Sequence, residues 1–201
     1  MRFLDFRKQF EEFNVITYQD VINVFGSVNQ SQFATWKKEK NIKSVKRGMY
    51  VLCDVDIDIM LLANEMNDSY ISFEFALSYH QIIPEITTSI TSVSNNRNEE
   101  INNDFATFYY YKIASKLFNG FYLIDSTIKK GRKIRIATPE KALFDLIYFR
   151  SDLKSKEDFN SLRLNCEKID LNEFKKFVDL VEAIQTKKRL NNFIKYLDVV
   201  I

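Results

Sequence analysis

The sequence predicts an α+β protein in which a small helical domain precedes a larger domain of mixed helices and strands. Short helical patterns fill residues 1–40 and lead into a hairpin pattern. Residues 86–137 are instead rich in Thr, Ile, Tyr and Phe, which is typical of strands. Helical spacing returns after residue 138. A chain of 201 residues can hold two domains, which we expect to span residues 1–53 and 54–201.

Composition and charge exclude several classes of protein. Hydrophobic residues make up 46% of the chain, enough for a core, but no apolar run approaches the roughly 18 residues that span a membrane. The N-terminus has no apolar signal-peptide core, and Cys53 and Cys166 lie far apart, so we expect a reduced, cytoplasmic protein. The net charge is only +2, so its distribution matters more than its sum.

Three short helices are predicted at the N-terminus. Apolar residues at spacings of three and four mark the first, which contains Phe3, Phe6, Phe10 and Phe13. Thr17, with Asp20 three residues later, predicts a capping box that begins the second helix, and Gly26 predicts its end. The third helix begins between Asn29 and Ser31, which are good N-cap residues. We expect its inward side chains to be Phe33, Ala34 and Trp36.

A hairpin pattern follows over residues 42–52, with its turn at Arg47-Gly48. Three short helices followed by a hairpin are typical of a winged helix-turn-helix, in which the third helix enters the major groove of DNA and the hairpin contacts the backbone. Residues 29–50 contain six Lys or Arg and one acid, Glu39, a net charge of +5. Positive charge concentrated on such a segment favours phosphate binding.

This segment supplies the candidate DNA-binding residues. Its polar side chains can hydrogen-bond base edges, and its basic side chains can contact phosphates. The candidates are Asn29, Gln30, Ser31, Gln32, Thr35, Lys37, Lys38, Lys40, Lys43, Lys46 and Arg47. Two other interpretations stay open: a solvated basic helix, or a winged helix that binds only protein.

Three alternating acids, Asp54, Asp56 and Asp58, suggest a competing catalytic hypothesis. On a strand they would share one face, and paired carboxylates can hold Mg²⁺ for phosphoryl transfer. We favour a simpler interpretation, in which they occupy a linker and the first turn of a helix over residues 57–66, where acids face the helix dipole. We therefore expect no catalytic residue, no metal and no cofactor.

The middle of the chain is predicted to contain one helix and then a sheet. We expect Ser72 to cap the helix and His80 to lie near its end. His80 is the single histidine and has no cysteine nearby, so a zinc site is excluded and a structural role is expected. The strand-type region predicts an antiparallel sheet of about four strands. The polar stretch 92–104 predicts a mobile loop.

The segment RIATPEKALFDLIYFR, residues 135–150, carries the start signals of a helix. Thr138 is a good N-cap, Pro139 fits the first helical position, and Glu140 favours the first turn. Asp145 is the polar interruption in an otherwise apolar helix, so we expect the helix to be buried. Asp170 and Glu173 predict a further helix with a stripe from Leu171 to Ile184, and another stripe begins at Leu190. The outer faces of these helices carry Lys175, Lys176, Lys187, Lys188 and Arg189. These side chains are either solvated or extend the surface that contacts DNA.

Three segments of the chain resemble the AbiEi family, the antitoxins and transcriptional regulators of bacterial AbiE-type (type IV) toxin–antitoxin systems. ATPEKALFDLIY (137–148) resembles the family signature, YISFEFALSYHQII (70–83) resembles an internal segment, and KRGMYVL (46–52) resembles the wing. Phe75 replaces a usually small residue, and Gln81 stands where Gly is usual. Residues 151–201 match no motif.

The resemblance implies a DNA-binding autorepressor and antitoxin that serves in phage defence by abortive infection, and it implies no catalytic role for Glu140 or Lys141. Its expected partners are an operator duplex with inverted repeats and a nucleotidyltransferase-like toxin, whose direct contact stays open, but no membrane. The alternatives are a metal-dependent phosphoryl-transfer enzyme that uses Asp54, Asp56 and Asp58, or a winged-helix adaptor that binds protein.

Overall fold

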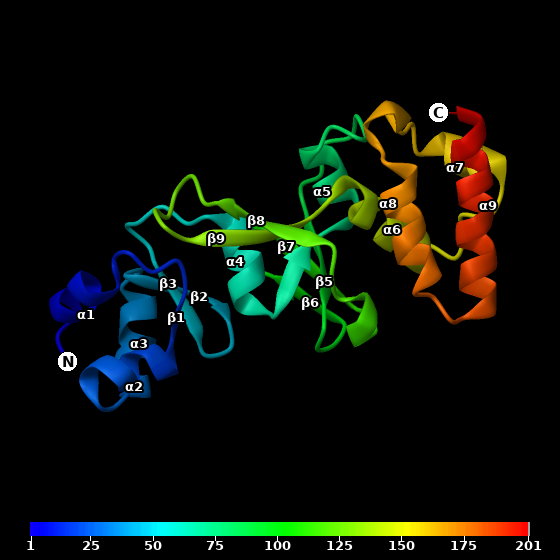
Figure 1. The fold of residues 1–201 in the computed structure, drawn as a ribbon. Coiled ribbons are helices and arrows are strands. Elements are labelled where there is room, and N and C mark those ends of the chain that lie inside the picture. The colour runs from blue at the N-terminus through cyan, green and yellow to red at the C-terminus, as the bar shows by residue number, and fades with distance from the viewer. Residues whose placement is uncertain (201) are drawn as a thin grey trace.

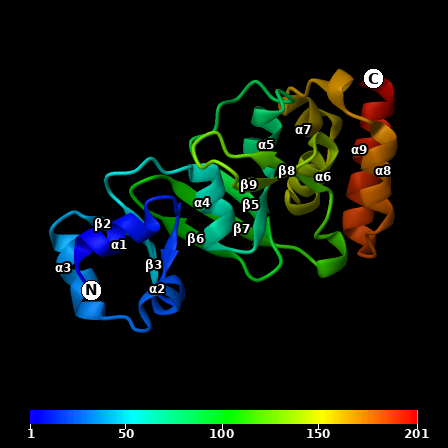
Figure 2. The same cartoon turned by 60° about the vertical axis from the view of Figure 1, so that its left-hand side comes forward.

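The computed structural model describes residues 1–200 and has an α+β architecture (Figure 1). Within this range there are two sheets, an antiparallel sheet of three strands near the N-terminus and a mixed sheet of six strands beyond it. The two chain ends lie at opposite ends of the molecule in both views (Figures 1 and 2). None of the described helices is long and apolar enough to cross a membrane.

The N-terminal part follows the predicted order of helices and hairpin. Its elements are α1 (Phe3–Phe10), β1 (Ile16–Thr17), α2 (Tyr18–Phe25), α3 (Gln30–Lys38), β2 (Ile42–Lys46) and β3 (Met49–Leu52), with strand order β1-β3-β2. The capping box of Thr17 and Asp20 is confirmed, and so is the N-cap Asn29. Gly26 ends α2 with φ of 75°, a left-handed conformation that glycine adopts without strain. Phe13 lies beyond the end of α1.

A cluster of aromatic side chains forms the N-terminal core. Phe6 of α1 packs against α3, with the ring centroids of Phe6 and Trp36 4.8 Å apart, and Phe10 packs against Phe6 and against Phe25 of α2. Phe33 lies 4.8 Å from Tyr50 of β3, so the cluster also joins α3 to the sheet. Such rings bury large areas and favour tilted contacts at these distances, so they hold α3 firmly on the domain.

The six-stranded sheet has the order β6-β7-β5-β4-β9-β8. α4 (Ile59–Met66) precedes its first strand, α5 (Phe73–Tyr79) joins its first and second strands, and the short helix η1 (Ser115–Leu117) precedes β8. Its strands are β4 (Ser69–Ile71), β5 (Ile90–Ser94), β6 (Glu99–Asn102), β7 (Thr107–Lys112), β8 (Phe121–Asp125) and β9 (Lys133–Ala137).

The prediction of about four antiparallel strands is wrong for this sheet. β7 inserts between β5 and β6, so β5 and β7 run parallel although hairpin connections would make them antiparallel neighbours. β4 also runs parallel to β9, and its three residues are too few to show a strand pattern. The mobile loop predicted for residues 92–104 is wrong as well, because this stretch contains the end of β5 and all of β6.

The helix predicted after Thr138 is confirmed as α6 (Pro139–Phe149), and it packs among α5, α8 and α9. Thr138 accepts a hydrogen bond from the Lys141 amide, and Pro139 occupies the first turn. Glu140 does more than favour the first turn. It is buried, and its Oε1 accepts a hydrogen bond of 3.1 Å from the Asp170 amide.

The chain ends in a group of helices on the far side of α6 (Figure 2). They are α7 (Lys156–Ser161), the short helix η2 (Cys166–Lys168), α8 (Leu171–Asp179) and α9 (Ile184–Val200). Asp170 caps α8 as predicted. The stripe predicted to reach Ile184 is wrong at its end, because α8 stops at Asp179 and Ile184 begins α9 with its side chain exposed.

The two parts of the molecule meet through hydrogen bonds between Asn14 and Asp58 and through packed valine side chains. The Asn14 side chain donates to the Asp58 carbonyl at 3.0 Å and accepts from the Asp58 amide at 2.8 Å. Val15, Val45 and Val51 belong to the core of the larger part. The sheets are therefore joined by buried side chains as well as by the chain.

Candidate nucleic-acid interface

The outer face of α3 is the candidate for contact with DNA bases. Phe33 and Trp36 point inward, as predicted, which fixes the opposite face toward solvent. The prediction that Ala34 points inward is wrong, because each residue turns 100° around a helix and carries Ala34 away from Phe33. The exposed outer positions are Gln30, Ser31, Ala34, Thr35 and Lys38.

Several of the predicted base-contacting residues bond to the protein itself. The Asn29 side chain accepts hydrogen bonds from the Ser31 amide at 3.1 Å and the Ser31 hydroxyl at 2.7 Å. Thr35 donates to the Ser31 carbonyl at 3.2 Å. Gln32 is half-buried and donates to the Met1 carbonyl at 3.0 Å, so it ties α3 to the start of the chain. Gln30 is the exposed amide of this face.

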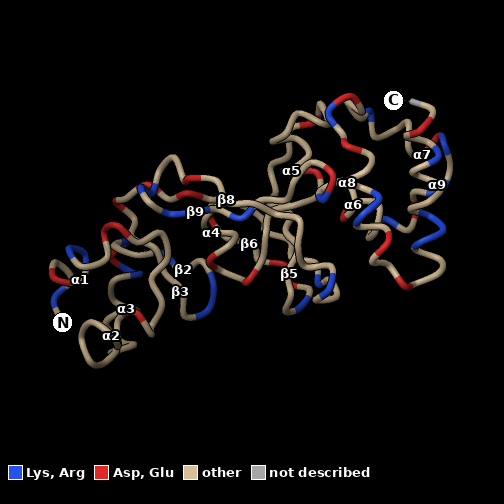
Figure 3. Tube along the Cα trace, in the orientation of Figure 1, with Lys and Arg blue, Asp and Glu red and all other residues tan. Residues whose placement is uncertain are grey.

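The six basic residues of the segment divide into two groups. Among the described residues, four form no ion pair and are exposed: Lys37, Lys38, Lys40 and Arg47. The other two contact acids of the larger domain. Lys43 lies 3.1 Å from Asp104, and Lys46 lies 2.7 Å from Glu99. Figure 3 shows the blue hairpin beside the six-stranded sheet.

Lys46 links the hairpin to β6, an edge strand of that sheet, through its ion pair with Glu99. Its ammonium group also donates to the Met66 carbonyl at 2.9 Å. Burial alone would raise the pKa of Glu99, but hydrogen bonds from Lys46 and Arg97 outweigh it and lower the pKa. Glu99 therefore holds its negative charge for Lys46. In this conformation Lys46 is occupied by protein groups, whereas Arg47, at the hairpin turn, stays free.

The aspartates of the catalytic alternative do not converge. Asp54 pairs with Arg7 at 2.6 Å, whereas Asp58 is buried. Asp58 is the N-cap of α4, and its side chain accepts hydrogen bonds from the amides of Met60 and Leu61. It also accepts a hydrogen bond of 2.5 Å from the Ser126 hydroxyl. The prediction placed acids in the first turn of this helix, whereas Asp58 precedes that turn as the N-cap and no acid lies within it. Within residues 1–200, no group of three or more His, Cys, Asp or Glu side chains lies close enough to hold a metal ion.

His80 lies at the end of α5, where the chain turns toward the next segment. Its Nε2 is 2.8 Å from the Ala137 carbonyl, which links α5 to the end of β9. Burial lowers the pKa of His80. The contact agrees with the structural role predicted for this histidine.

A buried charged cluster in α6 was missed from the sequence. The ammonium group of Lys141 lies 2.6 Å from Oδ1 of Asp145, and both side chains are fully buried. Tyr70 and Ser72 donate hydrogen bonds to the other carboxylate oxygen at 3.0 and 2.7 Å. Ser72 is the N-cap residue of α5 as predicted, but its hydroxyl makes no capping hydrogen bond and donates to Asp145 instead. The available signal was the pair of opposite charges four residues apart among apolar residues.

Comparisons with known proteins add no assignment. No protein-family model matches the chain, and no curated protein matches it either.

Proposed function

We propose that this chain is a DNA-binding transcriptional repressor whose first domain is a winged helix-turn-helix. The order helix, strand, helix, helix, strand, strand supports this, because it supplies a helix pair followed by a hairpin. Four residues join α2 to α3, and Gly26 lies among them, which is typical of a helix-turn-helix. In this proposal α3 enters the major groove and the Arg47 turn contacts the backbone.

The observation that carries the proposal is the set of exposed cations around the outer face of α3. Lys37, Lys38, Lys40 and Arg47 have no carboxylate partner among the described residues, so they are free to contact phosphates. Gln30 extends from the same helix and is suited to a base edge. Lys43 and Lys46 hold the hairpin to the larger domain and have a positioning role.

The wider role follows from the resemblance to AbiEi antitoxins. We propose that the protein is cytoplasmic, represses its own promoter at inverted repeats and protects the cell from a nucleotidyltransferase-like toxin. The geometry of α3 supports the proposal that the protein binds DNA. The antitoxin part has the three sequence segments in support, two of which lie in the larger domain at residues 70–83 and 137–148.

The salt dependence of DNA binding tests the first part. We would measure fluorescence anisotropy with a duplex from upstream of the gene and with a scrambled duplex of equal length. If four cations contact phosphates, log K should fall against log salt with a slope of about −3.6 per bound chain. A slope of about −5.4 would mean that Lys43 and Lys46 also leave their carboxylates. Binding that ignores salt would contradict the proposal and favour a protein-binding role.

Point variants separate affinity from specificity. Lys38→Ala should weaken both duplexes equally, whereas Gln30→Ala should reduce the preference for the upstream duplex. Lys8→Ala is the matched control, because Lys8 is exposed on α1 and outside the proposed face. The antitoxin role is tested by growth of cells that express the neighbouring toxin gene with and without this chain. Repression without protection would remove the antitoxin part alone.

A further inference from the structure

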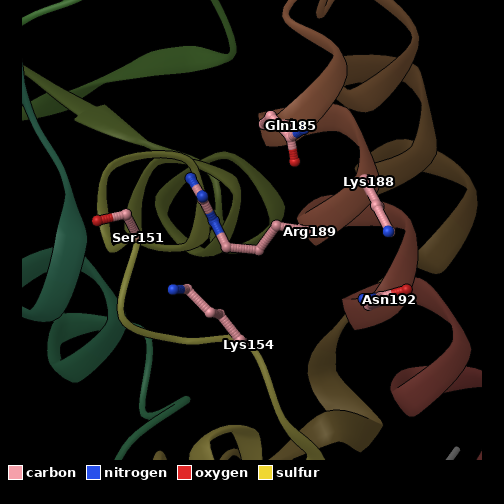
Figure 4. Close-up of a pocket in the computed structure, with 6 residues that line it drawn as sticks. All are labelled: Ser151, Lys154, Gln185, Lys188, Arg189 and Asn192. Carbon is pink, nitrogen blue, oxygen red and sulfur yellow. The ribbon is translucent and has the colours of Figure 1, made fainter.

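A cavity lined by cationic side chains lies between the end of α6 and helix α9. Its volume is about 450 Å³, within the range of small-molecule sites. All six lining side chains are polar, and they are Ser151, Lys154, Gln185, Lys188, Arg189 and Asn192 (Figure 4). Three are cations, and none is acidic. Such a lining is suited to an anion.

Arg189 is fixed in place before any ligand arrives. Its Nε donates to the Ile147 carbonyl at 3.0 Å, and Nη2 donates to the Tyr148 carbonyl at 2.7 Å. These bonds to the end of α6 hold the guanidinium plane while Nη1 makes no hydrogen bond to the described residues. In Figure 4, Lys154 and Arg189 both extend toward Ser151. Like charges repel at short range, so an anion between them would be stabilised by both.

Asp152, which follows the lining residue Ser151 in the chain, does not neutralise this cavity. Asp152 accepts hydrogen bonds from Arg150 Nε at 2.9 Å and Nη2 at 2.7 Å. The hydrogen bond from Arg150 lowers the pKa of Asp152 to about 2, and Arg189 contributes to the same shift. Arg150 therefore balances Asp152, and the charges of Lys154 and Lys188 remain available.

A second cavity of about 270 Å³ adjoins the first, and both are lined by Lys154 and Asn192. Its lining combines the apolar and aromatic side chains of Phe159, Tyr196 and Val199 with two more cations, Lys156 and Lys195. The Tyr196 ring is half-buried, and its centroid lies 5.5 Å from that of Phe159. Tyr196 follows Arg189 by seven residues, about 10 Å along the helix. An aromatic wall therefore lies beside the cationic cavity.

We propose that these joined cavities bind a nucleotide, with its phosphates among Lys154, Lys188 and Arg189 and its base against Tyr196. Cations with fixed donors suit phosphate oxygens, and aromatic rings accept any base by stacking. The same chemistry serves a free nucleotide or one unit of a single strand. Because the cavities lie at the opposite end of the molecule from α3 (Figure 1), this site is independent of the proposed DNA-binding face.

The test is calorimetric titration of the full chain with ATP, adenosine, pyrophosphate, a single-stranded hexanucleotide and a short duplex. We expect ATP or the hexanucleotide to bind, and pyrophosphate and adenosine to bind at least about tenfold more weakly, since each makes only part of the contacts. If the hexanucleotide binds more tightly than ATP, the natural ligand is a single strand. If the two bind equally, the natural ligand is a free nucleotide. The absence of binding by both overturns the proposal, as does pyrophosphate equal to ATP or a preference for the duplex.

Lys154 and Lys188 are exposed, so substituting them should keep the fold intact while it removes the contacts. Lys154→Gln with Lys188→Gln should weaken nucleotide binding about tenfold or more, since each removes a charge-assisted contact. Tyr196→Leu keeps apolar volume but removes the ring, so it should weaken ATP while pyrophosphate is unchanged. Lys175→Gln on α8 is the control and should bind as the parent chain does. Unchanged ATP binding in the double lysine variant, or in Tyr196→Leu, would overturn the assignment.

Discussion

Removing one partner of the buried Lys141–Asp145 pair should destabilise the protein strongly. Asp145→Asn keeps the shape and can still accept hydrogen bonds from Tyr70 and Ser72, but it leaves the Lys141 ammonium without its counter-charge. Because both side chains are fully buried, the expected loss is about 3–5 kcal/mol of the free energy of unfolding. For a chain of this size, that corresponds to a fall in Tm of roughly 6–20 °C.

Urea denaturation of three variants measures this effect. Asp145→Asn and Lys141→Met should each lower the free energy of unfolding. The double variant Lys141→Met with Asp145→Asn should lose less than the sum of the two singles, because it removes both charges while the side-chain amide keeps an acceptor for Tyr70 and Ser72. A double variant as unstable as the sum of the singles would refute the reasoning, as would an Asp145→Asn protein within about 1 kcal/mol of the parent.

The pH dependence of Asp145→Asn gives a second measurement on the same pair. Burial lowers the pKa of Lys141, and in the variant the opposing ion pair is gone. The unfolded chain then binds more protons than the folded chain between the folded pKa and the unfolded pKa of lysine. Stability of the variant should therefore rise with pH over the range that ends at the unfolded pKa of lysine. A variant whose stability falls over this range would contradict the account.

Three further changes test other contacts. Gly120→Ala should lower Tm because a Cβ there would lie 2.6 Å from the Phe177 ring at a φ of 76°, and a stability equal to the parent would contradict the packing. Glu99→Gln should free Lys46 and steepen the salt slope of DNA binding by about 0.9. In the parent chain the pKa of Glu99 is lowered, so the ion pair should persist above the unfolded pKa of Glu99. It should be lost when an acid titration passes the folded pKa of Glu99. Asp58→Ala should cost about 1–2 kcal/mol in urea denaturation through loss of the α4 cap, and no change would argue against the Asp58 contacts.

Local chemistry made the helix starts predictable. Thr17, Asn29, Thr138 and Asp170 all cap helices as expected, because a cap depends on side chains within three residues of the backbone that it satisfies. The hairpin around Arg47-Gly48 was predictable for the same reason, since its turn and its strands are adjacent in sequence.

Contacts between distant residues were not predictable in the same way. The parallel pairing of β5 with β7 depends on where β6 pairs, which no local pattern specifies. Charge counting treated Lys43 and Lys46 as free cations, but it could not locate Glu99 or Asp104 beside them. In α6, the apolar surroundings and the spacing of four residues could indicate a buried Lys141–Asp145 pair, but not that Tyr70 and Ser72 would donate to it.

The paired hydrogen bonds between Asn14 and Asp58 bear on how the chain can be divided. A fragment ending at residue 53 would contain the helices and hairpin of the first domain. It would lack the Asp58 backbone, so the buried Asn14 side chain would lose both of its hydrogen bonds to that backbone. It would also expose Val15, Val45 and Val51, which pack into the larger core. We therefore expect a fragment of residues 1–53 to be less stable than the same residues in the full chain. Contacts with the sheet that follows them contribute part of the stability of the first 53 residues.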